Sequence, residues 1–193
     1  MSIVTQFFTY LTNPGEILNS EINISNIKIS VKVTKNLKIL EKQDKCLSYF
    51  SKNNLIVKFN KYTTSVLGKN YNYLNFTGIS HFEEISICVS LFFELFSELV
   101  VYTDVVHIKI DSISICFSTT PGLKYSLIQL FDKKNFITKP PKFAGLIIRN
   151  RNCKYSITYF SSGKCIGVGL KSLKDCNDIY LDVLTLINKA SLL

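Results

Sequence analysis

The feature that most constrains the fold is an internal repeat, because two short segments recur at one fixed spacing. Residues 55–58 lie 91 residues before residues 146–149, and Thr77-Gly78 lies 91 residues before Val168-Gly169. A shared offset at two separate places indicates a tandem duplication of one structural unit. Two unrelated halves of similar composition are the alternative. At 193 residues, the chain is long enough for two such halves.

The first half contains the elements expected of one unit. Apolar and polar residues alternate over 22–33, which predicts a strand, and the break in the alternation at Asn26 is typical of a bulge. The other expected elements are a weak helix over 37–50, strands over 55–59, 63–67 and 71–78, and an amphipathic helix over 81–100.

The second half repeats this order of elements. A strand is expected over 108–117, and Pro121 precedes a short helix over 122–131. The remaining expected elements are strands over 143–149, 154–160 and 164–168, and a closing helix over 172–190.

These patterns predict an α+β fold of two tandem pseudo-symmetric repeats, each an antiparallel sheet with helices. The two sheets are expected to join into one curved surface. The expected boundaries are an N-terminal appendage over 1–20, a first repeat over 21–101 and a second repeat over 102–193.

The charge of the chain favours a polyanionic partner. Lys and Arg number 23 against 14 Asp and Glu, which gives a net charge of +9. Such an excess suits nucleic acid or an anionic membrane surface. All but two of the basic residues are lysine, however, and the chain is rich in Ile, Asn, Phe and Tyr, whose codons are AT-rich. The number of lysines therefore also reflects an AT-rich genome.

Catalysis, metal binding and membrane insertion are not expected. The chain has two histidines, His81 and His107, and lacks a glycine-rich phosphate loop or a nucleophile motif. Its six cysteines lie at least 11 residues apart, so they form no CxxC pair and are expected to be reduced thiols. Glu94 and Glu98 interrupt the most apolar window, 85–101, well short of the ~20 residues that span a bilayer. No secretory signal is expected, and neither enzyme activity nor a cofactor is predicted.

Three motifs near the C-terminus carry a family resemblance. They are Phe143–Arg149, Tyr159–Lys164 and Gly169–Lys171. Their spacing resembles that of F-P-G-L-I-x-R, I-F-x-S-G-K and T-G-A-K in the second repeat of the TATA-box-binding protein family. The likeness is specific over residues 143–171. Elsewhere it depends on the order of strands and helices.

The resemblance implies a saddle-shaped fold and a transcription initiation factor. Members of the family place a concave sheet in the minor groove of AT-rich promoter DNA, and phenylalanines inserted between base steps kink the duplex. Phe143 and Phe160 match this wedging pair, and burial of both in the core is the alternative. Ile166 and Val168 match groove-facing apolar positions, although the family usually has Thr in place of Val168.

The resemblance also assigns polar DNA contacts. Asn26 matches the asparagine at the centre of the groove face, with a turn or strand-edge role as the alternative. In the second half, either His107 or Ser112 is expected at the equivalent place. The other implied DNA-contacting residues are Arg149, Lys154, Lys164 and Lys171, near phosphates, and Thr77, Thr158 and Ser162.

The chain departs from the family at two places. In the first repeat, the two phenylalanine positions fall on Lys52 and Lys69, so this repeat is degenerate. One end of the saddle is therefore expected to bind phosphates without kinking the DNA. Before Phe143, the family has an acidic E-P-E-L that docks transcription factor IIB. This chain instead has a basic segment with the implied partner-binding residues Lys139, Pro141 and Lys142. Because the charge of this segment is reversed, its partner is expected to be a different or co-diverged initiation factor, IIB-like or otherwise, that works with RNA polymerase.

Two hypotheses follow from the sequence. The first is a transcription initiation factor that binds and bends double-stranded AT-rich DNA through the minor groove. The second is a saddle-fold protein-interaction subunit of a transcription complex, with weak or no bending. The expected location is the nucleus, or a cytoplasmic replication site if the protein is viral.

Overall fold

The computed structural model describes residues 3–12, 15–38, 40, 47–51, 54–68, 70–119, 135–138, 140, 142–150 and 155–192. Helices and antiparallel strands share the chain, which confirms the α+β class. The chain forms two compact units. Unit 1 contains residues 1–15 and 26–111, and unit 2 contains residues 16–25 and 112–193.

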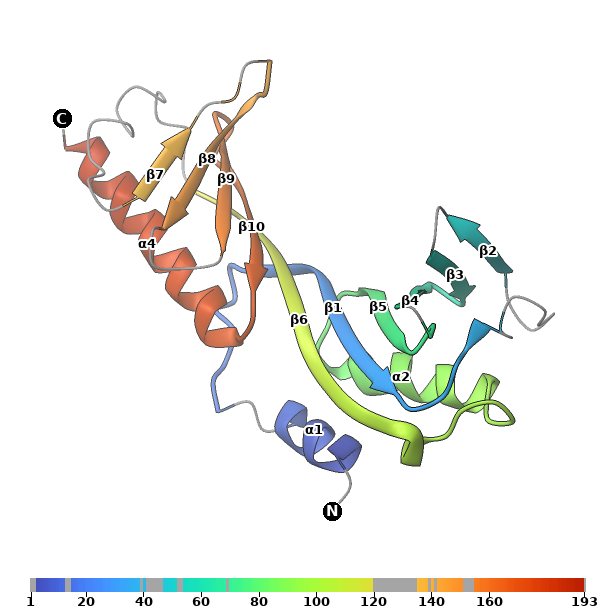
Figure 1. The fold of residues 1–193 in the computed structure, drawn as a ribbon. Coiled ribbons are helices and arrows are strands. Elements are labelled where there is room, and N and C mark those ends of the chain that lie inside the picture. Colours follow the sequence, from blue (N-terminus) through green and yellow to red (C-terminus); the bar gives the residue numbers. More distant parts are fainter. Residues whose placement is uncertain are drawn as a thin grey trace. The chain divides into compact units, whose positions relative to one another are not determined.

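Unit 1 contains an antiparallel sheet with the strand order β2-β3-β4-β5-β1. These strands are β1 (Asn23–Val33), β2 (Leu47–Ser51), β3 (Asn54–Phe59), β4 (Tyr62–Leu67) and β5 (Tyr73–Ile79). Helix α2 (Glu83–Leu95) lies against one face of this sheet (Figure 1). Helix α1 (Ile3–Thr12) contacts α2, and the side chain of Val4 is buried. A short 3-10 helix, η2 (Tyr102–Asp104), precedes β6 (Val105–Ser118).

The core of unit 1 follows from the alternation along its strands. Ile27 and Ile29 are fully buried on the side of the sheet that faces α2. There the ring of Phe92, from α2, lies 5.3 Å from Phe76 and 4.9 Å from Phe96, measured between centroids. These aromatic contacts fix the helix on one face. The opposite face of the sheet is left to polar and half-buried side chains.

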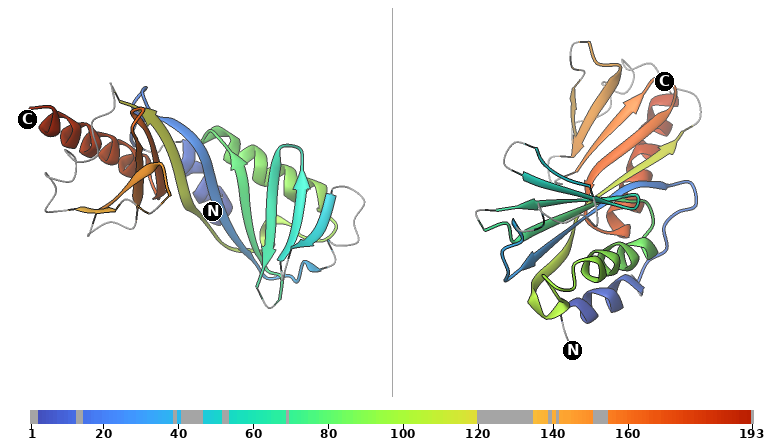
Figure 2. Two further views of the ribbon diagram at one scale, coloured as in Figure 1. Left: turned by 90° about the horizontal axis from the view of Figure 1, so that it is seen from above. Right: turned by 90° about the vertical axis from the view of Figure 1, so that its right-hand side faces the viewer.

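Unit 2 has the same construction, with the strand order β6-β10-β9-β8-β7. The strands that follow β6 are β7 (Asn135–Thr138), β8 (Gly145–Asn150), β9 (Ser156–Phe160) and β10 (Lys164–Leu170). Helix α4 (Leu173–Ser191) lies along one face of these strands (Figure 2). Its residue Tyr180 packs edge-on against Phe117 of β6, with ring centroids 5.1 Å apart.

The predicted repeat recurs in the strand pairing. In unit 1, Ile27 pairs with Ile79 and Ile29 with Phe76. In unit 2, Ile113 pairs with Leu170 and Ile115 with Gly167. Each ladder therefore has one extra residue at the same place, which is a β-bulge.

The bulge does not lie at Asn26, as the sequence pattern had indicated. Its extra residue belongs to the partner strand, at Gly78 in β5 and at Gly169 in β10. These glycines have φ angles of 87° and 88°, a region that side chains rarely adopt. Glycine therefore explains why the bulge forms on β5 and β10.

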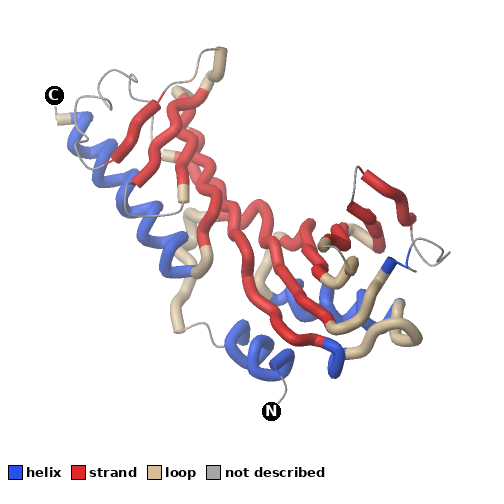
Figure 3. The backbone as a smooth tube through the Cα atoms, viewed as in Figure 1, coloured by secondary structure: helices blue, strands red, loops and turns tan. Residues whose placement is uncertain are grey.

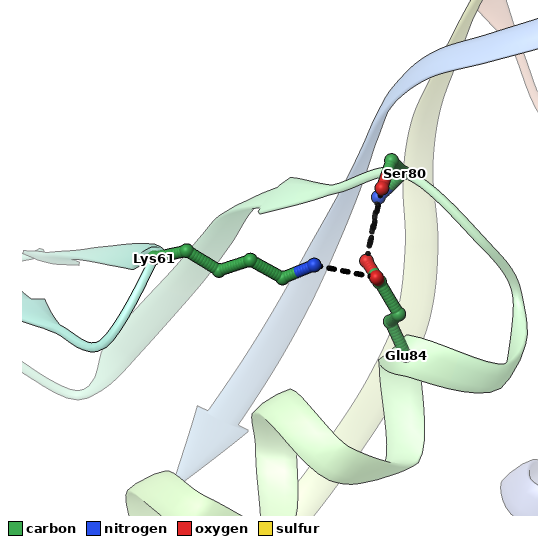
Figure 4. Close-up of polar contacts among 3 residues, drawn as sticks. All are labelled: Lys61, Ser80 and Glu84. Atoms are coloured by element: carbon green, nitrogen blue, oxygen red, sulfur yellow. Dashed lines mark hydrogen bonds and ion pairs between the residues drawn. The ribbon is translucent and has the colours of Figure 1, made fainter.

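An acidic residue anchors the start of each covering helix. Glu84 accepts a hydrogen bond from the backbone N–H of Ser80 at 3.0 Å, and Asp175 accepts one from Lys171 at 2.8 Å. Glu84 also pairs with Lys61, in the turn between β3 and β4 (Figure 4). The hydrogen bond from Lys61, together with that from Ser80, lowers the pKa of Glu84 to about 2.

Two strands differ from the sequence-based expectation (Figure 3). The helix predicted over 37–50 is wrong at its end, because Leu47–Ser51 forms β2, an edge strand paired with β3. Strand β7 was not predicted. The helix predicted over 122–131 lies outside the described residues. Within the described ranges, no helix is both long and apolar enough to cross a membrane.

Candidate nucleic-acid interface

The face of the unit 2 sheet that is turned away from α4 gathers many of the residues assigned from the resemblance. Along β9, Tyr159 and Ile157 are buried, whereas Phe160, Thr158 and Ser156 alternate with them and stay half-buried. We call the face that carries Ser156, Thr158 and Phe160 the open face of unit 2. It is formed by Cys116, Gly145, Ile147, Arg149, Ser156, Thr158, Phe160, Lys164, Ile166 and Val168.

Phe143 and Phe160 form an aromatic pair at one end of the open face of unit 2. Their ring centroids are 6.2 Å apart, and 41% of Phe143 is exposed. Both rings lie against Gly145, which pairs with Phe160 across β8 and β9. A Cβ atom on Gly145 would come within 2.9 Å of Phe143 and 3.3 Å of Phe160. Glycine is therefore needed beneath the pair, and neither ring belongs to the core.

The centre of the open face of unit 2 is apolar. Ile166 pairs with Thr158, which in turn pairs with Ile147 on β8. In the next row, Val168 pairs with Ser156 and is 41% exposed. The structure thus brings Thr158, Ile166 and Val168 together beside the aromatic pair, as the resemblance implies.

Basic side chains flank this apolar surface. Arg149 pairs with Ser156 at the end of β8, Lys164 begins β10, and both are exposed. Ser162 is exposed in the turn between β9 and β10. Lys142 and Lys171 are exposed just outside the strands, and Lys142 has a φ of 62°. Lys154, Lys139 and Pro141 lie outside the described residues.

Asn26 and Thr77 lie on the corresponding face of unit 1, the face turned away from α2. The side-chain Oδ1 of Asn26 accepts a hydrogen bond of 2.9 Å from the backbone N–H of Gly78. Because the oxygen is the acceptor, the amide orientation of Asn26 is fixed. Thr77, the neighbour of Gly78, donates from its hydroxyl to the carbonyl of Thr63 at 3.3 Å.

The strand register identifies the unit 2 counterpart of Asn26. Ile113 takes the place of Ile27, because each pairs with the residue that follows the bulge glycine. The residue before Ile113 is Ser112, so Ser112 occupies the place of Asn26, and His107 does not. The two units therefore present an amide and a hydroxyl at equivalent positions.

The register also corrects the expected counterpart of Phe160 in unit 1. Phe160 adjoins Tyr159, which pairs with Cys165, and the matching pair in unit 1 is Val66 with Leu74. The counterpart is therefore Leu67, a half-buried residue, and not Lys69. The turn that follows it, 68–72, is two residues longer than the turn 161–163, so an ungapped alignment fails there. Lys52 lies outside the described residues.

The open face of unit 1 is mainly polar. It is formed by Asn26, Lys28, Ser30, Lys32, Tyr49, Ile56, Lys58, Thr63, Ser65, Leu67, Tyr73, Asn75 and Thr77. Ser30 donates to Asn75 at 2.7 Å, and Lys28 forms an ion pair of 3.0 Å with Asp111. Unit 1 thus offers hydrogen bonds where unit 2 offers apolar contact.

Comparison with known proteins agrees with this arrangement. Residues 107–190 match the family model described as transcription factor TFIID, or TATA-binding protein (TBP). Among solved structures, Methanococcus jannaschii TBP is similar with a TM-score of 0.72 and 22% identity, over 88% of this chain and 99% of that chain. No curated protein matches the sequence significantly. The fold is that of a TATA-binding protein, which confirms the resemblance.

Proposed function

We propose that this chain, a TATA-binding-protein-like transcription factor, binds AT-rich double-stranded DNA through the minor groove and bends it with unit 2. The observation that carries the proposal is the pair of Phe143, which is exposed, and Phe160, which is half-buried, above Gly145 on the open face of unit 2. Apolar rings inserted between base steps kink a duplex, and the unstacking cost is offset by contacts that the bent DNA permits.

The surroundings of the pair suit this role. Ile147, Ile166 and Val168 offer an apolar surface to the sugars and base edges of a widened minor groove. Exposed apolar surface of this kind commonly marks an interaction site. The proposal assigns these contacts, with those of Thr158 and Ser162, to the duplex.

Asn26 supplies base contacts from β1 of unit 1. Its oxygen is held by Gly78, so the side chain can offer its NH₂ group to DNA. Adenine and thymine present acceptors in the minor groove, whereas guanine adds a donor there. An amide donor at this point therefore favours A·T over G·C pairs. Thr77, on the neighbouring strand, is assigned to the same contact surface.

Phosphate contacts come from basic residues at the border of the open face of unit 2. Arg149 and Lys164 are exposed there, and Lys171 follows β10. Lys154 is assigned the same role from the resemblance. Such contacts give affinity that falls with salt and carries little sequence information.

The protein partner of such a factor is proposed to be an initiation factor, IIB-like or otherwise, that recruits RNA polymerase. The segment with Lys139, Pro141 and Lys142 is basic, so its docking surface on the partner is expected to be acidic. The protein would act where its genome is transcribed, in the nucleus or at a cytoplasmic replication site.

Fluorescence anisotropy with labelled duplexes tests the groove and the sequence preference. An AT-rich duplex should bind more tightly than a GC-rich one, and affinity should fall steeply as salt rises. Netropsin, which occupies the minor groove, should compete, and methyl green, which occupies the major groove, should not. Equal affinity for both duplexes without netropsin competition would overturn the proposal and favour a protein-binding role.

A further inference from the structure

A tyrosine occupies an unexpected place on the open face of unit 1. At the turn between β9 and β10, unit 2 places Phe160 beside Lys164, and Lys164 pairs with Ser118 on β6. At the matching turn of unit 1, Leu67 pairs with Tyr73, and Tyr73 pairs with Lys32 on β1. Tyr73 therefore takes the position of Lys164, and Lys32 that of Ser118.

Compared with unit 2, unit 1 carries its aromatic residue and the neighbouring lysine one strand further across the sheet. In unit 2 the aromatic ring is on β9 and the lysine on β10. In unit 1 the ring is on β5 and the lysine on β1. Adjacent strands are about 4.8 Å apart, so the ring in unit 1 stands about that distance nearer β1. Leu67, at the original place, is half-buried and carries no aromatic ring.

The ring of Tyr73 is presented in the same manner as the phenylalanine pair. It is 42% exposed, and its Cδ2 atom would lie 3.1 Å from a Cβ atom on Gly68. The Nζ of Lys32 lies 5.3 Å from the ring centroid, within range of a cation–π contact. A glycine thus supports the ring from one side, as Gly145 does in unit 2.

A hollow of about 580 Å³ adjoins Tyr73 and is lined by side chains of mixed charge. Lys32, His107 and Lys109 contribute basic or ionisable groups, and Asp111 contributes the single carboxylate in the lining. Asp111 is paired with Lys28 at 3.0 Å, which reduces its repulsion of an anion. The hollow therefore suits a sugar-phosphate unit that lies beside an aromatic ring.

We propose that Tyr73 is the aromatic DNA-contact residue of unit 1, replacing the missing phenylalanine wedge of that unit. Its ring packs against a deoxyribose at the edge of the minor groove, while Lys32 pairs with the adjacent phosphate. This inference rests on the proposed function. Because no second aromatic ring is paired with Tyr73 among the described residues, its contact strengthens binding and contributes little to the kink.

The test compares Tyr73→Ala with Tyr73→Phe and with Ile87→Ala. Ile87 serves as the control because it is an exposed apolar residue of the same unit, 52% exposed, that lies away from the open face. It stands on α2, the helix that covers the other face of the sheet. Anisotropy gives the affinity for an AT-rich duplex, and FRET between the duplex ends gives the bend.

Tyr73→Ala should weaken binding about tenfold, in line with the loss of one aromatic contact to nucleic acid. Tyr73→Phe should bind within about threefold of the wild type, and Ile87→Ala should behave like the wild type. The bend angle should stay unchanged in all three. Thermal unfolding of each variant confirms that it is folded.

Three outcomes contradict the inference. Wild-type affinity in Tyr73→Ala would overturn it while leaving the proposed function intact. Equal weakening by Tyr73→Ala and Ile87→Ala would also overturn it, since the effect would then not be specific to this ring. A wild-type protein that binds no duplex would overturn the proposed function and this inference together.

Discussion

Asn26 and Gly78 are joined by a hydrogen bond in which the backbone N–H of Gly78 donates to the side-chain oxygen of Asn26 at 2.9 Å. The bulge at Gly78 makes this N–H available, and a Cβ atom there would lie 2.8 Å from the carbonyl of Lys61. The backbone of β5 thus orients the amide that we propose contacts base edges. Register places Ser112 and Gly169 at the equivalent positions of unit 2.

Asn26→Asp should weaken DNA binding at least about tenfold with little change in melting temperature. The carboxylate can still accept from Gly78, so the fold keeps its hydrogen bond, but it has no donor and adds a negative charge in the groove. Asn60→Asp, in the exposed turn between β3 and β4, makes the same charge change away from the open face. If both variants lose the same affinity, net charge explains the effect and the orientation of Asn26 does not matter.

Glu84 should give unit 1 an acid-sensitive contact. Its folded pKa is lowered to about 2 from 4.5 by the hydrogen bonds from Lys61 and Ser80. The contribution of the Glu84 carboxylate to the free energy of unfolding is therefore fully present above pH 4.5 and is lost as pH falls toward 2. Glu84→Gln should cost about 1 kcal/mol at pH 7, because the pair is partly solvated, and clearly less at pH 3.

Urea unfolding at the two pH values measures this difference, with Glu83→Gln as the control at the neighbouring exposed position. A cost for Glu84→Gln that is the same at pH 7 and pH 3 would show that the ionised carboxylate contributes nothing specific.

Thr64→Val should stabilise the protein by about 1 kcal/mol. Thr64 is fully buried on β4, and its hydroxyl is the only buried side-chain polar atom among the described residues that has no hydrogen-bond partner. Burying an unpaired hydroxyl costs free energy that an apolar group of similar shape avoids. Chemical denaturation measures the change, and Thr63→Val, which is half-buried, serves as the comparison. A lower unfolding free energy for Thr64→Val would mean that the hydroxyl is satisfied in solution.

DNA should protect Cys116 from alkylation. Cys116 is half-buried on the open face of unit 2 and pairs with Ile166, so a bound duplex would cover it. Cys88, Cys165 and Cys176 are buried, and burial raises the pKa of each thiol to about 12, so they should react slowly with or without DNA. Mass spectrometry after iodoacetamide treatment resolves each site. Equal labelling of Cys116 in the presence of saturating DNA would place the duplex elsewhere.

The sequence predicted the elements whose signal is local and strong. The offset between Gly78 and Gly169 predicted the repeat, because a bulge at this place requires glycine in both units. The proximity of Phe143 and Phe160 could be predicted because both lie in a motif without gaps. The positions of these residues follow from the sequence close to them more than from pairing between strands that are far apart in the sequence.

The residues that sequence reasoning missed depend on pairing between strands. Leu67 and Tyr73 were missed because the turn between them is longer than its counterpart, and only the ladder reveals the shift. Ser112 and His107 could not be distinguished, since both lie within one continuous strand, β6. Strand β2 was read as helix because Leu47 and Phe50 are three residues apart, a spacing that matches one face of a helix, whereas pairing with β3 makes this segment a strand.

Bending of an AT-rich duplex by the wild type and by the double variant Phe143→Ala with Phe160→Ala tests the central claim most directly. FRET between dyes at the duplex ends reports the bend, and Ile87→Ala with Leu181→Ala is the control. Ile87 on α2 and Leu181 on α4 are 52% and 57% exposed. The account predicts that the wild type and the helix variant bend DNA and that the phenylalanine variant does not. An equal bend in all three proteins, or no bend with the wild type, would contradict it.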